Sequence, residues 1–254
     1  VAVAGCFIED LTITRNATES LDLVIGGTHW KEGDEAVMAE QDYGSMIDMF
    51  KMVAKKYGVV NKIVSVPNHP SSDEEIVELY ANAITPKTKL LMVCHMINIT
   101  GQILPIQKIC DMAHSKGVKV MVDGAHAFAH ITFSLPDLHC DYYGTSLHKW
   151  LSAPLGCGFL YVKKENISDL WPLLADNPKL DDDKILRLGH TGTNPMHTNL
   201  SIANALDYYS KIGAERKEAR LRYLQRYWTD KVRNLENIII NTPLEMQRSC
   251  GIAN

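Results

Sequence analysis

The sequence predicts an α/β fold, in which helices flank a mostly parallel central sheet. Two observations carry this prediction. Short apolar or β-branched runs alternate with helix-like segments along most of the chain. Two of these runs, residues 89–95 (KLLMVCH) and 118–123 (VKVMVD), are apolar almost throughout, as expected of strands that are buried on both faces.

The first elements follow in this alternating order. Residues 11–14 (LTIT) form a β-rich run, and the following RNATESLDLVIGG predicts a helix that Asn16 or Thr18 caps. Residues 62–66 (KIVSV) are a second strand candidate. The segment SSDEEIVELYANAI then predicts a helix, because its second serine and second glutamate, Ser72 and Glu75, have the spacing of a capping box.

The alternation continues through the middle of the chain. After the buried strand at 89–95, PIQKICDMAHSKG predicts a helix with Pro105 in its first turn and Gly117 just past its end. Three further strands are expected at residues 118–123 (VKVMVD), 141–146 (DYYGTS) and 158–162 (GFLYV).

The character of the sequence changes near residue 212. GAERKEARLRYLQRYWTDKVRNLENI is a long charged helical pattern, and IIINTP (238–243) follows as a strand-like run. This shift predicts one large domain over residues 1–212, then a linker helix and the start of a small α+β domain over 213–254. The chain has no initiator methionine and stops soon after the shift, so we expect both a missing N-terminal part and a truncated second domain.

Composition excludes several classes of protein. The formal net charge of -4 leaves no electrostatic footprint for nucleic acid or an anionic membrane. No apolar run has the length of a transmembrane helix, and the N-terminus lacks a signal peptide. Six scattered cysteines without a CxxC pair indicate reduced thiols rather than a disulfide framework or zinc site. A cytoplasmic protein without a metal site is therefore expected.

Three segments carry candidate chemistry at the carboxyl ends of strands, where open parallel sheets bind ligands. Asp123 ends the strand VKVMVD, and taken alone it fits a turn or helix-cap aspartate as well as a functional carboxylate. RNATES combines a helix start with the Thr18 hydroxyl, which suits a phosphate as well as ordinary capping. In GTSLHKW, Ser146 and His148 flank the approach to Lys149, which is either a snorkelling lysine or a nucleophile.

One ligand explains these three segments together. Pyridoxal 5′-phosphate (PLP) carries a phosphate, a basic ring nitrogen and an aldehyde that forms a Schiff base with a lysine. RNATES together with Ser146 and His148 would bind the phosphate, Asp123 would face the ring nitrogen, and Lys149 would bind the aldehyde carbon. A single shared explanation is more economical than three independent structural roles.

With these residues in hand, the chain resembles the class V aminotransferase family of fold type I PLP-dependent enzymes. The resemblance is to the branch typified by isopenicillin N epimerase, with cysteine desulfurases more distant. It is carried by RNATESL, HMINITGQILPI, VMVDGAHA, CDYYGTSLHKWLSAPLGCGFLYV and LGHTGTNPMHTNLSIANALDYY. These stretches lie between residues 11 and 209, within the large domain of residues 1–212, which the resemblance identifies as the PLP-binding domain.

The resemblance implies a role for each matching residue. Lys149 is similar to the lysine of the Schiff base, Asp123 to the partner of the pyridinium nitrogen, and His126 to the residue that hydrogen-bonds the phenolic oxygen. The implied phosphate ligands are Ala17, Thr18, Ser146 and His148. Asn98 matches an asparagine beside the ring oxygen, and Tyr43 falls where relatives stack a ring on the cofactor. A packing role remains open for Tyr43, and a core role for His126.

The resemblance also implies a homodimer, in which Thr193 reaches the cofactor phosphate of the neighbouring subunit. The implied activity is PLP-dependent chemistry on an α-amino acid, of the epimerase or aminotransferase type. Cysteine desulfurase or lyase chemistry at the same site stays open, because one cofactor site supports all of these reactions. An inactive family member that serves as a binding module stays open as well, and so does a metal-binding protein that uses Asp123, His126 and His130.

Overall fold

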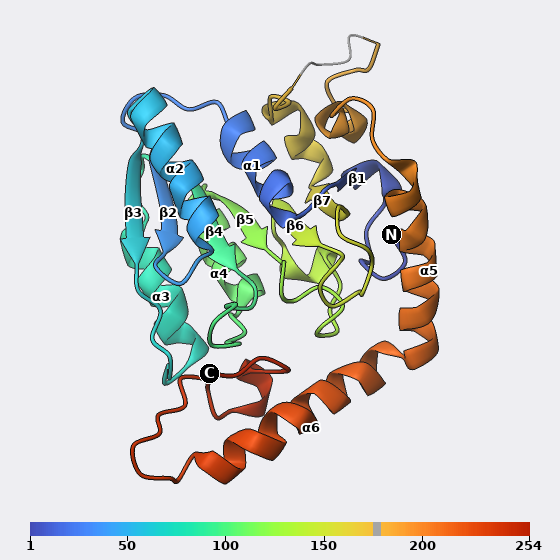
Figure 1. The fold of residues 1–254 in the computed structure, drawn as a ribbon. Helices are drawn as coiled ribbons and strands as arrows, with labels where there is room; N and C mark the ends of the chain where they lie inside the picture. The colour runs from blue at the N-terminus through green and yellow to red at the C-terminus, as the bar shows by residue number, and fades with distance from the viewer. Residues whose placement is uncertain (175–178) are drawn as a thin grey trace.

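The computed structural model describes residues 1–174 and 179–254 and contains a seven-stranded sheet in the order β1-β7-β6-β5-β4-β2-β3 (Figure 1). Strands β6, β5, β4, β2 and β3 are parallel to one another, whereas β7 runs antiparallel to both β6 and β1. The strands are β1 (Leu11–Thr14), β2 (Glu35–Ala39), β3 (Val60–Val64), β4 (Thr88–Cys94), β5 (Lys119–Asp123), β6 (Tyr142–Ser146) and β7 (Gly158–Val162). The predicted α/β class with a mostly parallel sheet is therefore confirmed.

Helices cover both faces of this sheet (Figure 1). Helices α1 (Ala17–Gly27) and α2 (Gly44–Tyr57) pack on one face, and α3 (Asp73–Ala83) and α4 (Ile106–Ser115) on the other. Along β4, Leu90 and Met92 belong to the first core and Leu91 and Val93 to the second. Because successive side chains of a strand alternate between faces, residues 90–93 of this strand all have to be apolar.

The sequence signals for helix ends act as expected in three helices. The Asn16 side chain accepts a hydrogen bond from the Glu19 N–H at 2.9 Å and caps α1, and Ser72 accepts from the Glu75 N–H at 3.2 Å at the start of α3. Gly117 follows α4 with a φ of +73°, a conformation that glycine adopts without a steric penalty.

Two predictions about individual elements differ from the structure. Strand β2 and helix α2 were not predicted, although they lie between the first predicted helix and residues 62–66. The run 238–243 was predicted as a strand, and this is wrong: it has no regular secondary structure. Its Ile239 side chain is 81% exposed, so the apolar run has no sheet to join within the described chain.

The C-terminal part consists of two long helices, α5 (Met196–Ile212) and α6 (Ala214–Val232), and a returning segment that ends below α3 and α4 in Figure 1. The Arg248 guanidinium pairs with the Asp73 carboxylate of α3 at 2.8 Å and ties this segment to the sheet domain. The division at residue 212 remains a prediction. Among the helices of residues 1–174 and 179–254, none has an apolar stretch that could span a bilayer.

Candidate active site

The pairing of β4, β5 and β6 places the candidate residues at one edge of the sheet. Asp123, the last residue of β5, lies opposite Cys94 of β4 and Gly144 of β6 in the strand register. Ser146 ends β6, and the turn that carries Lys149 follows directly. Since these strands are parallel, their carboxyl ends open on the same side, where ligands of such sheets bind.

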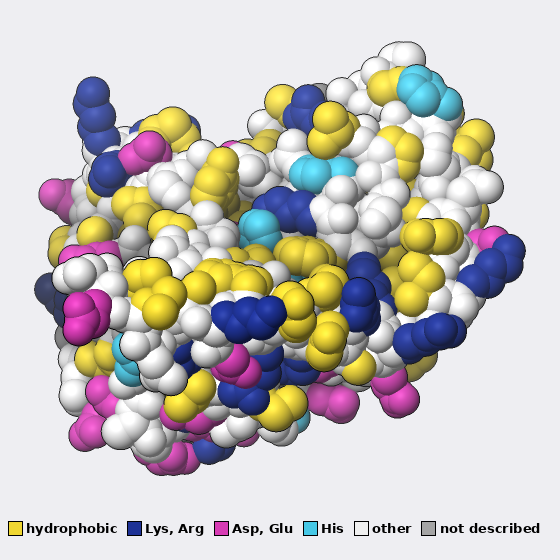
Figure 2. All heavy atoms as spheres, turned by 60° about the horizontal axis from the view of Figure 1, so that its bottom comes forward, with side chains coloured by type: hydrophobic (Ala, Val, Ile, Leu, Met, Phe, Trp, Pro, Cys, Tyr) yellow, Lys and Arg dark blue, Asp and Glu magenta, His cyan; other side chains and the backbone are white. Residues whose placement is uncertain are grey.

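A cavity of about 240 Å³ lies at this edge. Figure 2 views the molecule from this side, and Lys or Arg and His side chains gather there in a hollow of the surface. The cavity is lined by Asn16, Ala17, Thr18, Leu21, Tyr43, Met46, Cys94, Asn98, Asp123, Ala125, His126, Ser146, His148 and Lys149. The structure thus brings together nine of the ten residues that the sequence proposed as cofactor ligands.

Lys149 is half-buried in this cavity. Its Nζ lies 3.0 Å from Nε2 of His126. Burial lowers the pKa of the Lys149 ammonium, because a charged amine loses hydration there, whereas the Asp123 carboxylate acts in the opposite direction. A larger fraction of this amine is therefore uncharged at neutral pH than in a solvated lysine, as a nucleophile or proton acceptor requires.

Asp123 is 4% exposed. Its Oδ1 accepts a hydrogen bond from the Ala125 N–H at 2.9 Å, in the turn that follows β5. Burial raises the pKa of this carboxyl, while the Ala125 N–H and the charge of Lys149 lower it. A buried carboxylate is stable only beside a cation or donors, so a protonated ring nitrogen next to Asp123 would complete its environment.

His126 follows β5 by three residues and contacts two neighbours. Besides Lys149, it meets Trp150, whose indole Nε1 donates to Nδ1 of His126 at 3.4 Å. Burial, together with the positive charges of Lys149 and His148, lowers the pKa of His126 to about 4. The ring is therefore neutral at physiological pH.

The start of α1 and the end of β6 line the cavity together and form a candidate anion cradle. The Ala17 N–H, in the first turn of α1, donates to Oγ of Ser146 at 2.8 Å. Thr18 is the next residue of this turn, and its hydroxyl makes no hydrogen bond among the described residues. Nδ1 of His148 is buried without a partner there. A helix start carries a partial positive charge, and the Thr18 hydroxyl can donate a hydrogen bond, so these groups fit an anion.

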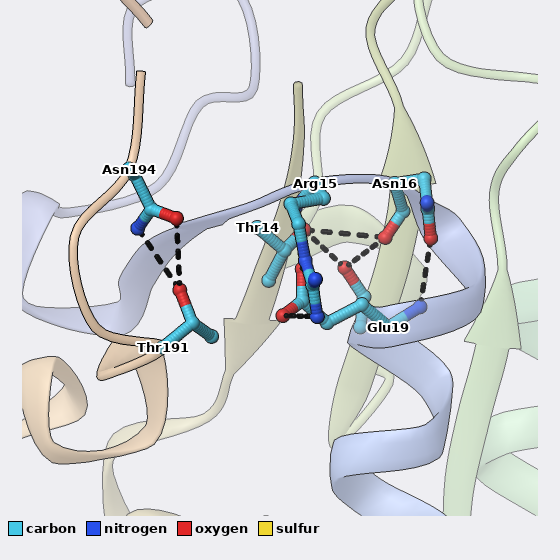
Figure 3. A network of polar contacts seen from close by, with 7 residues as sticks. Thr14, Arg15, Asn16, Glu19, Thr191 and Asn194 are labelled. Carbon is cyan, nitrogen blue, oxygen red and sulfur yellow. Dashed lines mark hydrogen bonds and ion pairs between the residues drawn. The ribbon is translucent and has the colours of Figure 1, made fainter. Parts of the chain in front are cut away.

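Two features hold this helix start in place. Figure 3 shows the Glu19 carboxylate turned back to the Arg15 guanidinium, with Nη2–Oε1 at 2.9 Å, and the Asn16 side chain capping the helix. A Cβ on Gly158 of β7 would come within 2.4 Å of the Thr145 carbonyl oxygen and 2.8 Å of Cα of Asn16. Only glycine permits this close approach of β7 to the cradle.

Tyr43, Asn98 and Thr193 complete the set of predicted residues. Tyr43 precedes α2 and is exposed at the rim of the cavity, and Asn98 lies in the loop after β4. Thr193 is exposed in the loop before α5 and does not line the cavity. Its predicted role toward a neighbouring subunit is therefore not tested within a single chain.

The sequence reasoning missed Cys94, whose thiol lines the cavity beside Asp123. The rule that located Asp123, a polar residue at the carboxyl end of a buried strand, applies equally to Cys94.

The metal-site alternative is wrong for His130, because its Nδ1 contacts the His126 carbonyl oxygen at 2.7 Å and its Nε2 accepts from the Gly251 N–H at 2.8 Å. Over the described residues, no three or more His, Cys, Asp or Glu side chains form a group that could hold a metal ion.

Comparisons with known proteins agree with this arrangement. A family model described as aminotransferase class-V matches residues 8–254. Isopenicillin N epimerase from Amycolatopsis lactamdurans is 30% identical over 256 residues, which cover 94% of this chain and 64% of that protein. A probable cysteine desulfurase from Synechocystis sp. is 31% identical over 217 residues, which cover 81% of this chain and 51% of that protein. The chain therefore spans only part of the length of these relatives.

Solved structures share the fold. A mutant of a cystine C–S lyase, with glycine covalently linked to its PLP cofactor, superposes with a TM-score of 0.87 at 21% identity. The match covers 99% of this chain and 68% of that one. The apo cysteine desulfurase of Thermococcus onnurineus gives a TM-score of 0.84 at 23% identity and covers 99% and 64% of the two chains.

Proposed function

The chain belongs to the class V aminotransferase family, and on this premise we propose that it is a PLP-dependent enzyme acting on an α-amino acid. The family indicates the cofactor, and one observation carries the assignment of residues to it. A half-buried lysine, a buried aspartate and a helix start with the Thr18 hydroxyl line the same cavity.

The residues of the cavity fit PLP in chemical type. The cofactor has an anionic phosphate, an aldehyde and a ring nitrogen that is basic. The α1 start with Thr18 and Ser146 would hold the phosphate, and the unpartnered Nδ1 of His148 offers a further contact there. Asp123 would hold the ring nitrogen in its protonated form, and Lys149 would bind the aldehyde carbon.

When bound, the cofactor withdraws electrons from the α-carbon of an attached amino acid, so that its bonds break more easily. The protein's own residues then handle the proton. Lys149 would take it from the α-carbon, because burial favours the uncharged amine. His126, which stays neutral, lies 3.0 Å from that amine and orients it. Asp123 supplies the negative charge that keeps the electron-withdrawing form in place.

For the type of reaction, we propose epimerisation or transamination. The 30% identity to an isopenicillin N epimerase over 94% of the chain supports this choice. Desulfurase or lyase chemistry is the second candidate, because a probable cysteine desulfurase matches at 31% identity over 81% of the chain. All of these reactions share the removal of a group from the α-carbon or its neighbour next to Lys149.

The decisive experiment is to add PLP to the purified chain, reduce with borohydride and map the modified peptide. The proposal expects one reduced adduct on Lys149 and none in Lys149→Ala. Lys119→Ala is the matched control, since Lys119 pairs with Asp169 outside the cavity and its loss leaves the adduct unchanged. Absence of the adduct from Lys149 would overturn the proposal.

A second assay separates the candidate reactions. The loaded protein is incubated with L- and D-amino acids in deuterium oxide, and NMR follows exchange at the α-carbon. Exchange with loss of chirality supports epimerisation, keto-acid formation supports transamination, and sulfide release from cysteine supports the second candidate. No exchange and no product with any amino acid would leave the inactive binding module as the better description.

We extend the proposal to a homodimer in which Thr193 contacts the cofactor phosphate of the neighbouring subunit. In support, Thr193 is exposed and lies outside the cavity of its own chain. Native mass spectrometry of the loaded protein should detect the dimer, and Thr193→Ala should weaken PLP binding in the dimer. Two results would contradict this extension: a loaded protein that is monomeric, or a Thr193→Ala variant that binds PLP with unchanged affinity.

A further inference from the structure

Both ring nitrogens of His126 have a hydrogen-bonding neighbour. The indole N–H of Trp150 lies 3.4 Å from Nδ1, and the Lys149 amine lies 3.0 Å from Nε2. The two neighbours differ in chemistry. An indole nitrogen can only donate a hydrogen bond, whereas a lysine amine only donates when charged and can also accept when neutral.

This difference selects one tautomer of the imidazole. Because Trp150 can only donate, Nδ1 of His126 has to carry the lone pair. A neutral imidazole bears one proton, which is then on Nε2 and faces Lys149. We propose that Trp150 is a positioning residue, which fixes the Nε2–H tautomer of His126 and so presents a hydrogen-bond donor, rather than a lone pair, to the reactive amine. This inference rests on the contacts alone and adds a residue to the proposed site.

Trp150 is itself held at its ring and at its backbone. The His130 ring stacks on it with centroids 3.6 Å apart and planes at 26°. His130 is in turn fixed at both nitrogens, by the His126 carbonyl oxygen and by the Gly251 N–H. The Lys217 amine, from the first turns of α6, donates to the Trp150 carbonyl oxygen. The C-terminal segments therefore support the orientation of the indole.

The fixed tautomer has a consequence for the amine. A donor at Nε2 matches the lone pair of neutral Lys149 and does not match an ammonium group. The contact therefore favours the uncharged lysine in the same direction as burial. When Lys149 is engaged elsewhere, the same N–H is available to an oxygen atom in the cavity. The opposite tautomer would supply neither interaction.

The test uses the chain without cofactor, labelled with ¹⁵N-histidine, and His126→Gln identifies the His126 signals. In the unsubstituted protein near neutral pH, the expected shifts are those of a protonated Nε2 and an unprotonated Nδ1. Trp150→Phe keeps a ring against His130 and removes only the donor. The population ratio of the Nε2–H tautomer to the Nδ1–H tautomer of His126 should then fall by roughly fivefold, as expected for the loss of one hydrogen bond.

Trp171→Phe is the matched control, because the Trp171 indole makes the same type of contact, to Nδ1 of His29 at 3.0 Å, and neither residue lines the cavity. It should leave the His126 shifts unchanged. A protonated Nδ1 on His126 in the unsubstituted protein would overturn the proposal, even if Trp150→Phe failed to fold. A tautomer ratio of His126 that stays the same in Trp150→Phe would also overturn the proposal. Neither result depends on PLP binding, so the proposal can fail while the proposed function stands.

Discussion

Replacing Ser146 by alanine tests the anion cradle most directly. Ser146 is 4% exposed and ends β6, and its Oγ accepts the hydrogen bond of the Ala17 N–H at 2.8 Å. It joins the first turn of α1 to the sheet. Because its oxygen accepts from Ala17, its own proton is free to donate toward an anion in the cavity. The substitution removes both interactions and almost no volume.

The two losses have different sizes and different observables. A buried N–H without a partner costs about 1–3 kcal/mol, so Ser146→Ala should lower the free energy of unfolding of the unliganded chain by that amount. The donor to a charged phosphate is worth about 1.5–3 kcal/mol. Its loss should weaken PLP binding by roughly 10- to 100-fold.

Urea unfolding measures the first quantity, and equilibrium titration with PLP the second. Ser20→Ala is the matched control. Ser20 is fully buried and lies one turn after Ala17 in α1. It donates to the Phe159 carbonyl oxygen at 2.9 Å and does not line the cavity. It should lose comparable stability and keep its affinity for PLP. If Ser146→Ala binds PLP as tightly as the unsubstituted chain, the phosphate does not lie at this helix start.

Three further predictions concern other groups. Asp123→Asn should bind PLP with an affinity within about tenfold of the unsubstituted chain. Its rate of α-proton exchange should fall roughly 100-fold or more, because the neutral amide does not hold the ring nitrogen protonated. Exchange at the original rate would refute the role of Asp123. Burial and the nearby Asp123 charge raise the pKa of Asp42 to about 8. The stabilising contribution of the protonated Asp42 is fully present below pH 3.8 and is lost as the pH rises through about 8. Asp42→Asn should therefore gain stability relative to the unsubstituted chain as the pH rises from 3.8 to about 8, measured by urea unfolding, and a constant difference would contradict this assignment. Ser72→Ala should cost about 1 kcal/mol of unfolding free energy through the lost cap of α3, whereas Ser115→Ala at the exposed end of α4 should cost less.

The sequence was most informative where burial or capping constrains the choice of residues. Strands β4 and β5 are buried on both faces, so their apolar runs stand out from the surrounding sequence. The caps Asn16 and Ser72 and the terminal Gly117 have local signals that neighbouring residues do not override. These elements could be located without tertiary information.

The missed and wrong elements lacked such signals. Strand β2 (EAVMA) is fully buried, but alanine, methionine and glutamate are not typical strand formers, and the strand is specified by pairing with β3 and β4. Conversely, 238–243 has the composition of a strand and no neighbouring strand to pair with in the described chain. Because a strand depends on pairing with its neighbours, composition alone missed β2 and wrongly predicted a strand at 238–243.

The candidate site was accessible from sequence for a reason that lies in strand register. Asp123 pairs with Gly144, two residues before Ser146 and five before Lys149. Once β5 and β6 are adjacent and parallel, the acid, the hydroxyl and the amine have to emerge at one edge. A slip of a single residue between these strands would turn their side chains to the opposite faces and bury Leu21 and Met121 against different neighbours. The apolar cores on the two faces therefore hold the reactive groups in register. What the sequence could not supply was the orientation of His126, because the Trp150 that contacts it is held by distant residues. Lys217 binds the Trp150 carbonyl oxygen from 67 positions later, and Gly251 binds the His130 ring that stacks on the indole from 121 positions after His130.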